Sequence, residues 1–249
     1  MEEQIIEHDE WNYGIPKLQR ASKIELGHIY GVLPFDGVRN PSSRSSTAHR
    51  VFLTYKTAAN DWKPKVGICE SSAEAAVAFE ALISASTHDL HFQPLTVDYR
   101  DEDGRRRQHT FDLLITNRNG HRRLVFVRNA ASLEKPKTQR EIQAIAAATP
   151  KQAADDLIVV DANEYTRQRR ENLFRMYRCA FEPDPEADEI VLSTARRLKT
   201  LWHMKDLFPH VPIPQHRAFA ACYRLVGQRY LRANLDQVLW ERSRIEVAA

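Results

Sequence analysis

The sequence predicts an α/β domain followed by a mostly helical domain. Between residues 50 and 162, short segments rich in β-branched and aromatic residues alternate with segments whose apolar residues recur at helical spacing. Beyond residue 162 strand signals become rare, and basic amphipathic segments take their place. The chain has 249 residues, and at about 150 residues per domain this length accommodates two domains.

The composition is that of a folded protein. Apolar residues make up 43% of the chain and charged residues 28%, which argues against global disorder. No apolar run approaches the roughly 18 residues that a membrane span requires, and the N-terminal MEEQIIEHDE lacks the apolar segment of a secretion signal. The three cysteines, Cys69, Cys179 and Cys222, form neither a CxxC pair nor a disulfide framework. We therefore expect a cytoplasmic protein that does not enter a membrane.

Residues 1–48 predict a flexible arm. They lack a sustained hydrophobic period and include the turn-rich stretch GVRNPSSRSSTAHR. We expect one short strand in the arm, at about Ile29–Leu33. Arg39, Arg44 and Arg50 are suited either to a DNA minor groove or to another subunit, and the sequence leaves these two open.

Residues 49–162 predict the α/β domain. VFLTY at 51–55 has the composition of a strand, and residues 70–85 predict a helix that Ser71 or Ser72 caps. Three strand signals follow, and the turns DEDG and NRNG between them predict an antiparallel meander over residues 91–99, 105–116 and 121–129.

The α/β domain ends with a second helix and a last strand. The helix begins near Pro136, a residue suited to a first helical turn, and continues to Ala148. LIVVD at 157–161 is short, apolar and β-branched, which predicts a buried strand.

Residues 163–249 predict the helical domain. Basic residues fill a helix over 163–180, a second helix covers 184–200, and the break VPIP precedes a third helix over Gln215–Leu231. A small hairpin in DQVLWERSRIEVA closes the chain. This order is typical of a winged helix-turn-helix, and we expect its apolar core to contain Trp202, Phe208, Phe219, Tyr223 and Tyr230.

The helix after the turn enters the DNA major groove in such a fold. On the helix over Gln215–Leu231 the side chains that we expect to be exposed for this contact are His216, Arg217, Arg224, Gln228 and Arg229. Helix-turn-helix proteins often dimerise to read two half-sites, so a homodimer would fit, although no heptad or apolar patch identifies its interface.

Arginine clusters point to the same partner. The net charge is only +3, but arginines gather at 105–107 and along 167–178. Guanidinium groups pair bidentately with phosphates and guanine edges, so we expect double-stranded DNA as the partner. Solvated, salt-bridged faces are an equally good reading of any single cluster. The candidate phosphate contacts outside the third helix are Arg105, Arg107, Arg167 and Arg170.

The α/β domain has the layout of a PD-(D/E)XK nuclease core. SSAE places Glu74 at a helix start, Gln93 precedes a proline on the first meander strand, and HTFDLLI supplies Asp112. The turn NG is followed by LVFV and Arg128. In such a core, acidic groups hold a divalent ion that activates water, because hard cations prefer oxygen ligands.

In this order and spacing the chain resembles the TnsA endonuclease family, the cutting subunit of certain bacterial heteromeric transposons. The resemblance covers residues 50–160 and, more loosely, the helical domain, but not the arm. It implies that Glu74, Asp112 and Arg128 occupy the catalytic positions, with Gln93 nearby.

Three departures from the family pattern argue against catalysis. Phe111 replaces a proline, Phe126 replaces the metal-binding glutamate, and Arg128 replaces the lysine. Strand alternation puts Phe126 on the face of Arg128, so we expect its ring to point into the metal site, where it supplies no ligand. Arginine stays protonated and cannot exchange a proton with water. We expect no cofactor, and Mg²⁺ on Glu74 and Asp112 only if the site is functional.

Two alternatives remain open. The first is an active Mg²⁺-dependent endonuclease whose missing groups have migrated to the next helix, where Glu134 and Glu141 would supply the carboxylate and Lys135 or Lys137 the ammonium group. A solvated helical turn is the simpler interpretation of these four residues. The second alternative is a protein-interaction subunit of a transposase-like complex.

The histidines of the α/β domain do not predict a metal site. His88, His91, His109 and His121 lack the spacing of a helical zinc pair, and no cysteine accompanies them. The favoured hypothesis is a DNA-binding protein derived from a TnsA-like nuclease, catalytically inactive and associated with the nucleoid. It would serve DNA architecture, regulation or a transposition-type assembly, with a transposase-like or regulatory protein as partner.

Overall fold

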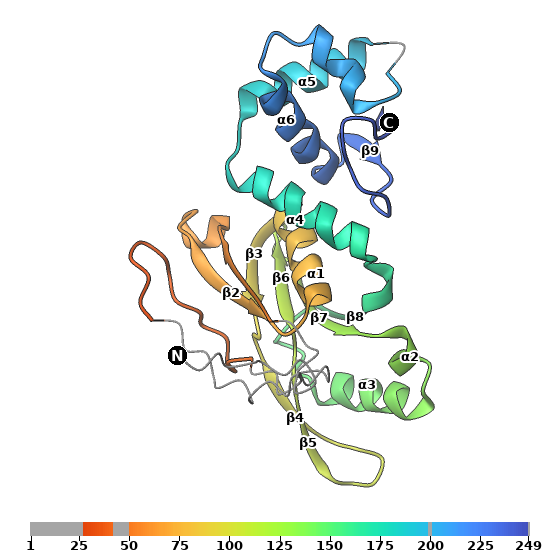
Figure 1. Ribbon diagram of the computed structural model, residues 1–249. Coiled ribbons are helices and arrows are strands. Elements are labelled where there is room, and N and C mark those ends of the chain that lie inside the picture. The colour runs from red at the N-terminus through yellow and green to blue at the C-terminus, as the bar shows by residue number, and fades with distance from the viewer. Residues whose placement is uncertain (1–26, 42–49, 199–200, 249) are drawn as a thin grey trace, which may run out of the picture.

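The computed structural model describes residues 27–41, 50–198 and 201–248. A mixed α/β core is joined to a helical region through α4 (Arg167–Phe181), as Figure 1 shows. The predicted α/β class is confirmed. The predictions for residues 1–26 and 42–49, including that for Arg44, lie outside the described residues.

The central sheet has the strand order β3-β6-β7-β8. β3 (Thr87–Phe92), β6 (Leu113–Asn117) and β7 (Arg122–Arg128) are antiparallel, which confirms the meander. β8 (Asp156–Asp161) lies parallel to β7. The connection between these two parallel strands therefore crosses the sheet, and its helices cover one face.

Helices pack on both faces of this sheet. Because side chains alternate along a strand, Val125 packs in the core on the side of α1 (Ser72–Ile83). Phe126 packs on the other side with Ile145 of α3 (Pro136–Ala148). The sheet thus forms the middle of three layers.

Two of the predicted meander strands are broken. β4 (Thr96–Arg100) and β5 (Arg106–Thr110) form an antiparallel hairpin beyond the ends of β3 and β6. At the break Gln93 has a left-handed φ of 49°, and its N–H donates to the carbonyl of Asp112 at 2.9 Å. Pro94 follows and has no N–H to donate to a ladder. The break places Asp112 between two strands instead of within one.

One strand was missed. β2 (Lys65–Cys69) pairs antiparallel with the predicted β1 (Val51–Tyr55). Gly67 interrupts its apolar pattern, and the structure explains why glycine is there: a Cβ at this position would lie 2.7 Å from the ring of Phe92. The short helix α2 (Ala130–Leu133) was also missed.

The arm strand predicted at Ile29–Leu33 is wrong. Tyr30 and Gly31 form a turn, Gly31 with a φ of 75°, and only Leu33 makes a bridge, to Lys65.

The helical region follows the predicted order. α5 (Pro185–Arg197) is followed by a 3-10 helix (Met204–His210) and by α6 (Gln215–Gly227). α6 ends before the predicted Leu231, because Arg229 adopts a φ of 67° and the chain then enters the closing hairpin. The two strands of this hairpin are antiparallel: β9 (Leu231–Ala233) and β10 (Ile245–Val247).

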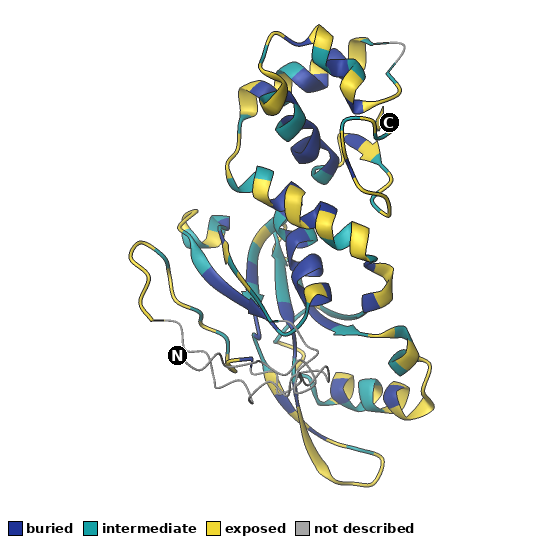
Figure 2. Cartoon of the chain, in the orientation of Figure 1, coloured by how far each residue is buried: buried dark blue, intermediate teal, exposed yellow. Residues whose placement is uncertain are grey.

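One apolar core crosses the predicted domain boundary at residue 162. It includes residues from Tyr55 in β1 to Ile245 in β10, and α4 packs against both α1 and α6. The end of α6 lies so close to α1 that a Cβ on Gly227 would be 2.3 Å from Ile83 Cγ2. Figure 2 shows the resulting burial of α6 along most of its length. In the described part of the chain, no helix combines the length and the apolar character that a membrane crossing needs.

Candidate functional site

Glu74 is held at the N-terminus of α1. Ser71 caps this helix, since its Oγ accepts from the Glu74 N–H at 3.2 Å and donates to Glu74 Oε1 at 3.0 Å. The backbone N–H of Glu70 donates to Glu74 Oε2 at 2.8 Å. Both carboxylate oxygens are therefore satisfied by groups of the helix start, and the residue is buried.

Asp112 lies at the break between β5 and β6. Its Oδ2 accepts from the N–H of Val127 on β7 at 2.8 Å, and the residue is buried. Burial, followed by the negative charge of Glu74, raises the pKa of Asp112 to about 8. Burial also raises the pKa of Glu74. The thiol of Cys69 lies near both carboxyls, and its pKa is raised by burial and by these two charges.

The structure therefore brings the two predicted carboxylates close together, since both residues are buried and the charge of Glu74 acts on Asp112; we call their surroundings the carboxylate pocket. Gln93 belongs to this pocket and is fully buried. Its Oε1 accepts from Arg39 Nη2 at 3.0 Å and from Arg39 Nε at 3.3 Å. Arg39 Nη2 also lies 3.0 Å from Glu70 Oε2. Arg39 is one of the three arm arginines for which the sequence suggested either a DNA minor groove or another subunit as the partner.

Phe126 packs in the apolar cluster beneath α3. Its ring centroid lies 4.1 Å from that of His109, and the Arg128 guanidinium lies 4.6 Å above its ring. The charge of Arg128 still reaches Asp112 and acts to lower its pKa. Burial, with Arg128, lowers the pKa of His109 to about 4, so this histidine is neutral at pH 7. Phe126 thus serves as a support for Arg128 and as part of the core.

These residues do not fit a resident Mg²⁺ ion. Within the described ranges, no three His, Cys, Asp or Glu side chains are arranged to hold a metal. Glu74 and Asp112 are only two carboxylates, whereas Mg²⁺ demands near-octahedral oxygen ligation. The residues considered as replacements lie in other contacts: Glu141 accepts from the Tyr99 hydroxyl at 2.5 Å, and Lys137 Nζ lies 3.8 Å from Glu102 Oε1.

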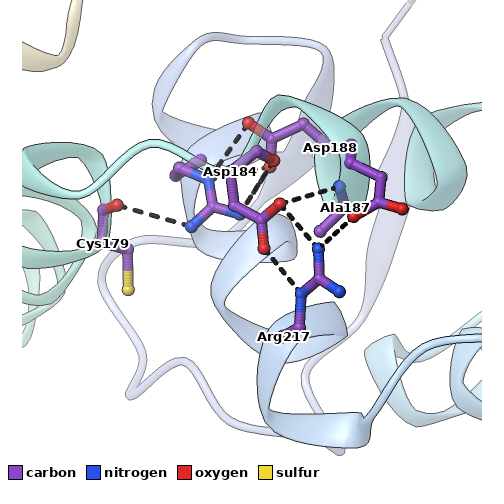
Figure 3. A network of polar contacts seen from close by, with 7 residues as sticks. Cys179, Asp184, Ala187, Asp188 and Arg217 are labelled. Atoms are coloured by element: carbon purple, nitrogen blue, oxygen red, sulfur yellow. Dashed lines mark hydrogen bonds and ion pairs between the residues drawn. The ribbon is translucent and has the colours of Figure 1, made fainter.

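The arginines of α6 correct the prediction of an exposed recognition surface. Arg224 is only 3% exposed, and its Nε donates to Asp188 Oδ1 at 2.8 Å. Arg217 is half-buried; its Nε donates to Asp184 Oδ2 at 2.8 Å and its Nη2 to Glu186 Oε2 at 2.6 Å. Figure 3 shows Arg217 directed at the start of α5, where Asp184 also caps the helix by accepting from the N–H of Ala187. These guanidinium groups are occupied by internal carboxylates and tie α6 to α5.

The other predicted α6 contacts differ in exposure. His216 and Arg229 are exposed, and Gln228 is half-buried.

The four arginines predicted to contact phosphate outside α6 differ in the groups that they contact within the chain. Arg107 Nε donates to Asp101 Oδ2 at 3.0 Å, and Arg105 lies 3.6 Å from Asp103. Arg170 donates to Ser72 Oγ and to the carbonyl of Ala162. Arg167 is exposed and has no carboxylate partner among the described residues.

Sequence reasoning missed a surface at the closing hairpin. Trp202 and Tyr230, expected in the core, are 57% and 46% exposed, and Trp240 is 50% exposed. The Arg244 guanidinium lies 5.2 Å from the Trp202 ring centroid, and that of Arg242 lies 5.5 Å from Trp240. The signal in the sequence was the run W-E-R-S-R over residues 240–244, which places a tryptophan and two arginines within five residues.

Backbone pairing brings Trp202 and Arg232 beside the segment that carries the two arginines. The N–H of Ile245 donates to the carbonyl of Trp202, and Arg232 of β9 is the register partner of Glu246 of β10. Residues 244 and 246 share a side of the extended chain, and cross-strand partners project to the same side, whereas Arg242 lies in the turn before β10. We call the resulting exposed surface the hairpin face; it consists of Trp202, Arg232, Trp240, Arg242 and Arg244.

Comparison with models of protein families gives no match, and no curated protein sequence matches the chain.

Proposed function

We propose that this protein binds double-stranded DNA through the hairpin face and does not cleave it. It would derive from a TnsA-like nuclease and act in DNA architecture, regulation or a transposition-type assembly, alone, as a homodimer or with a transposase-like or regulatory protein. The observation that carries the proposal is the pair of exposed arginine–tryptophan stacks at the closing hairpin.

The two stacked arginines are free to bind phosphate. Among the described residues neither Arg242 nor Arg244 has a carboxylate partner, whereas Arg217 and Arg224 are saturated by Asp184, Glu186 and Asp188. Stacking on an indole holds a guanidinium plane while leaving its N–H edges available, and bidentate N–H pairs suit phosphate oxygens. Pre-ordered arginines also lose less conformational entropy on binding than mobile ones.

The carboxylate pocket supports the absence of cleavage. With a pKa of about 8, Asp112 is mostly protonated at pH 7 and is a poor cation ligand in that form. Phe126 supplies no oxygen, and Arg128 cannot give up a proton. The pocket therefore lacks both the ligand oxygen of the glutamate and the exchangeable proton of the lysine that metal-dependent cleavage of the family type would use.

Paired substitutions test the binding surface. We expect Arg242→Ala/Arg244→Ala to weaken duplex binding about tenfold or more, and to make the log–log dependence of affinity on salt shallower by about 2, because each phosphate contact releases counterions. Fluorescence anisotropy with a labelled duplex, repeated over a salt series, measures both quantities.

The matched control removes the same charge at another site. Arg105→Ala/Arg106→Ala lies in the β4–β5 hairpin, which Figure 1 places at the end of the molecule opposite the closing hairpin. We expect this variant to bind nearly as the unaltered chain does. Equal losses in both variants would contradict a hairpin-face site, and the absence of any salt-dependent binding would favour the protein-interaction alternative.

A further inference from the structure

The turn after β1 holds a tryptophan out in solvent. A 3-10 helix (Ala58–Asn60) begins this turn, and Asp61 and Trp62 then adopt left-handed φ values of 55° and 58°. Residues with a Cβ rarely take this conformation, and it is least favourable for a bulky residue such as tryptophan. Trp62 is nevertheless 60% exposed, so burial of its ring does not offset the strain.

Hydrogen bonds fix the turn in this shape. The N–H of Trp62 donates to the carbonyl of Thr57 at 3.0 Å, and the N–H of Thr57 donates to Asn60 Oδ1 at 2.9 Å. The hydroxyl of Thr57, a buried residue, donates to Asp89 Oδ1 of β3 at 3.0 Å. The turn is therefore anchored to the central sheet. Backbone strain that the surrounding structure maintains in this way is concentrated at functional sites, ligand-binding sites among them.

Trp62 lines a pocket at the end of α4. The lining also includes Leu82 of α1 and, from α4, Tyr177, Ala180 and Phe181. In Figure 1 the orange turn after β1 lies next to the end of α4 from which the chain continues to α5. The pocket has a volume of about 220 Å³. Pockets for whole small molecules measure roughly 300–1,000 Å³, so this one is suited to a single large side chain.

The aromatic part of the lining is held in place by the core. The hydroxyl of Tyr177 donates to the carbonyl of Thr54 in β1, and its ring stacks on that of Phe79 with the centroids 4.8 Å apart. The ring of Phe181 meets that of Tyr177 edge-on, with the centroids 6.0 Å apart. A lining that is already ordered loses little conformational entropy when a ligand binds.

The pocket carries a positive charge. Of the described residues that line it, Lys56 is the one with a charged side chain, and its Nζ lies 4.1 Å from the centroid of the Phe181 ring. Lys56 has no carboxylate partner within the described ranges. The ammonium group is therefore available to a carboxylate that arrives together with an apolar group.

We infer that this pocket binds a partner protein through one aromatic or branched aliphatic side chain flanked by acidic residues. The apolar side chain contacts the rings of Trp62 and Phe181, and a neighbouring carboxylate pairs with the ammonium group of Lys56. Tryptophan is enriched among the few residues that supply most of the binding energy of an interface. None of these residues belongs to the hairpin face, so the inference does not rest on DNA binding.

A defined peptide tests the inference. The probe is Glu-Glu-Phe-Glu-Glu with 4-fluorophenylalanine at its centre, and titration of its ¹⁹F resonance with the protein gives the affinity. We expect saturable binding that weakens as salt is added, because the charges attract through solvent. The basic peptide Lys-Lys-Phe-Lys-Lys with the same label should bind at least about threefold more weakly. Unlabelled Glu-Glu-Ala-Glu-Glu should compete at least about tenfold less well than unlabelled Glu-Glu-Phe-Glu-Glu.

Two variants assign the binding to the pocket. Trp62→Gly removes the ring but keeps the turn, since glycine takes a left-handed φ without steric cost. It should weaken binding of the acidic peptide about tenfold or more and leave Tm unchanged or higher. Lys56→Gln should weaken binding about threefold, whereas the exposed Lys151→Gln should not change it.

Several outcomes would overturn the inference. These are no binding of the acidic peptide to the unaltered chain, equal affinity for the acidic and basic peptides, and full affinity in Trp62→Gly. A marked fall in Tm in Trp62→Gly would mean that the ring serves packing. Sedimentation velocity that shows a dimer lost in Trp62→Gly would assign the pocket to a second copy of the chain. Duplex affinity is measured separately, so a failure of the proposed function leaves these results unchanged.

Discussion

Burial and the charge of Glu74 keep the carboxyl of Asp112 protonated at neutral pH. A carboxyl whose pKa rises on folding stabilises the folded state at low pH, and this stabilisation is lost as the pH rises from the ordinary pKa of 3.8 through the folded pKa of about 8. The residue therefore links the stability of the whole chain to a group that the family resemblance would have made a metal ligand.

Replacing this carboxyl with an amide should remove the pH dependence that it causes. Between about pH 6 and pH 9, we expect the unaltered chain to lose roughly 2–3 kcal/mol of unfolding free energy relative to Asp112→Asn. Urea unfolding at both pH values measures the difference, and the exposed Asp103→Asn should show none. A constant difference between the unaltered chain and Asp112→Asn would mean that Asp112 is ionised throughout this range.

At the scale of single residues, sequence reasoning found the two carboxylates and Gln93 but not the contact of Arg39 with Gln93. The resemblance to the TnsA family singled out Glu74, Asp112 and Gln93, and the helix cap at Ser71 agrees with the position of Glu74. Arg39 contacts Gln93 across 54 residues of sequence, and no local pattern predicts such a distant pairing. The same reason explains Arg217 and Arg224, whose partners at the start of α5 belong to another helix.

Among the elements, α6 is a packing helix. Seven of its residues are buried, including Arg224. The start of α5 offers Asp184, Glu186 and Asp188, which also suit the positive end of that helix. Ion pairs from α6 to this helix start therefore fix the two helices relative to each other.

Breaking the buried ion pair between Arg224 and Asp188 should lower the stability of the fold and should not act through a lost DNA contact. We expect Arg224→Met to cost about 3–5 kcal/mol in unfolding free energy, because it leaves Asp188 partly buried without its partner. Arg197→Met, on the exposed side of α5, should cost less than about 0.5 kcal/mol. Urea unfolding measures both. A stable Arg224→Met protein with reduced DNA affinity would instead assign Arg224 to the DNA contact.

The boundaries of several elements depend on tertiary features that intrinsic secondary-structure propensities do not capture. The positions of α1, α3 and β8 followed from caps and apolar periodicity. The break at Gln93 arises from a left-handed residue before a proline, and β2 is tolerated with Gly67 only because Phe92 fills the space. Tertiary packing decided both, so composition alone gave two strands that were too long and left another unrecognised.

At the scale of the whole molecule, the carboxylate pocket and the hairpin face lie in different parts of the fold. The carboxylate pocket lies in the α/β core, where Arg39 contacts Glu70 and Gln93, while the hairpin face lies in the helical region. A continuous apolar core through α4 joins them. The central claim is that the protein holds duplex DNA and leaves it intact.

One titration tests this claim most directly. Labelled duplex DNA is titrated with the protein in the presence of Mg²⁺ or Mn²⁺, and each sample is run on a native and on a denaturing gel. We predict a shifted band whose strands remain full length. Cut strands that disappear in Asp112→Ala would contradict the account and establish an active endonuclease.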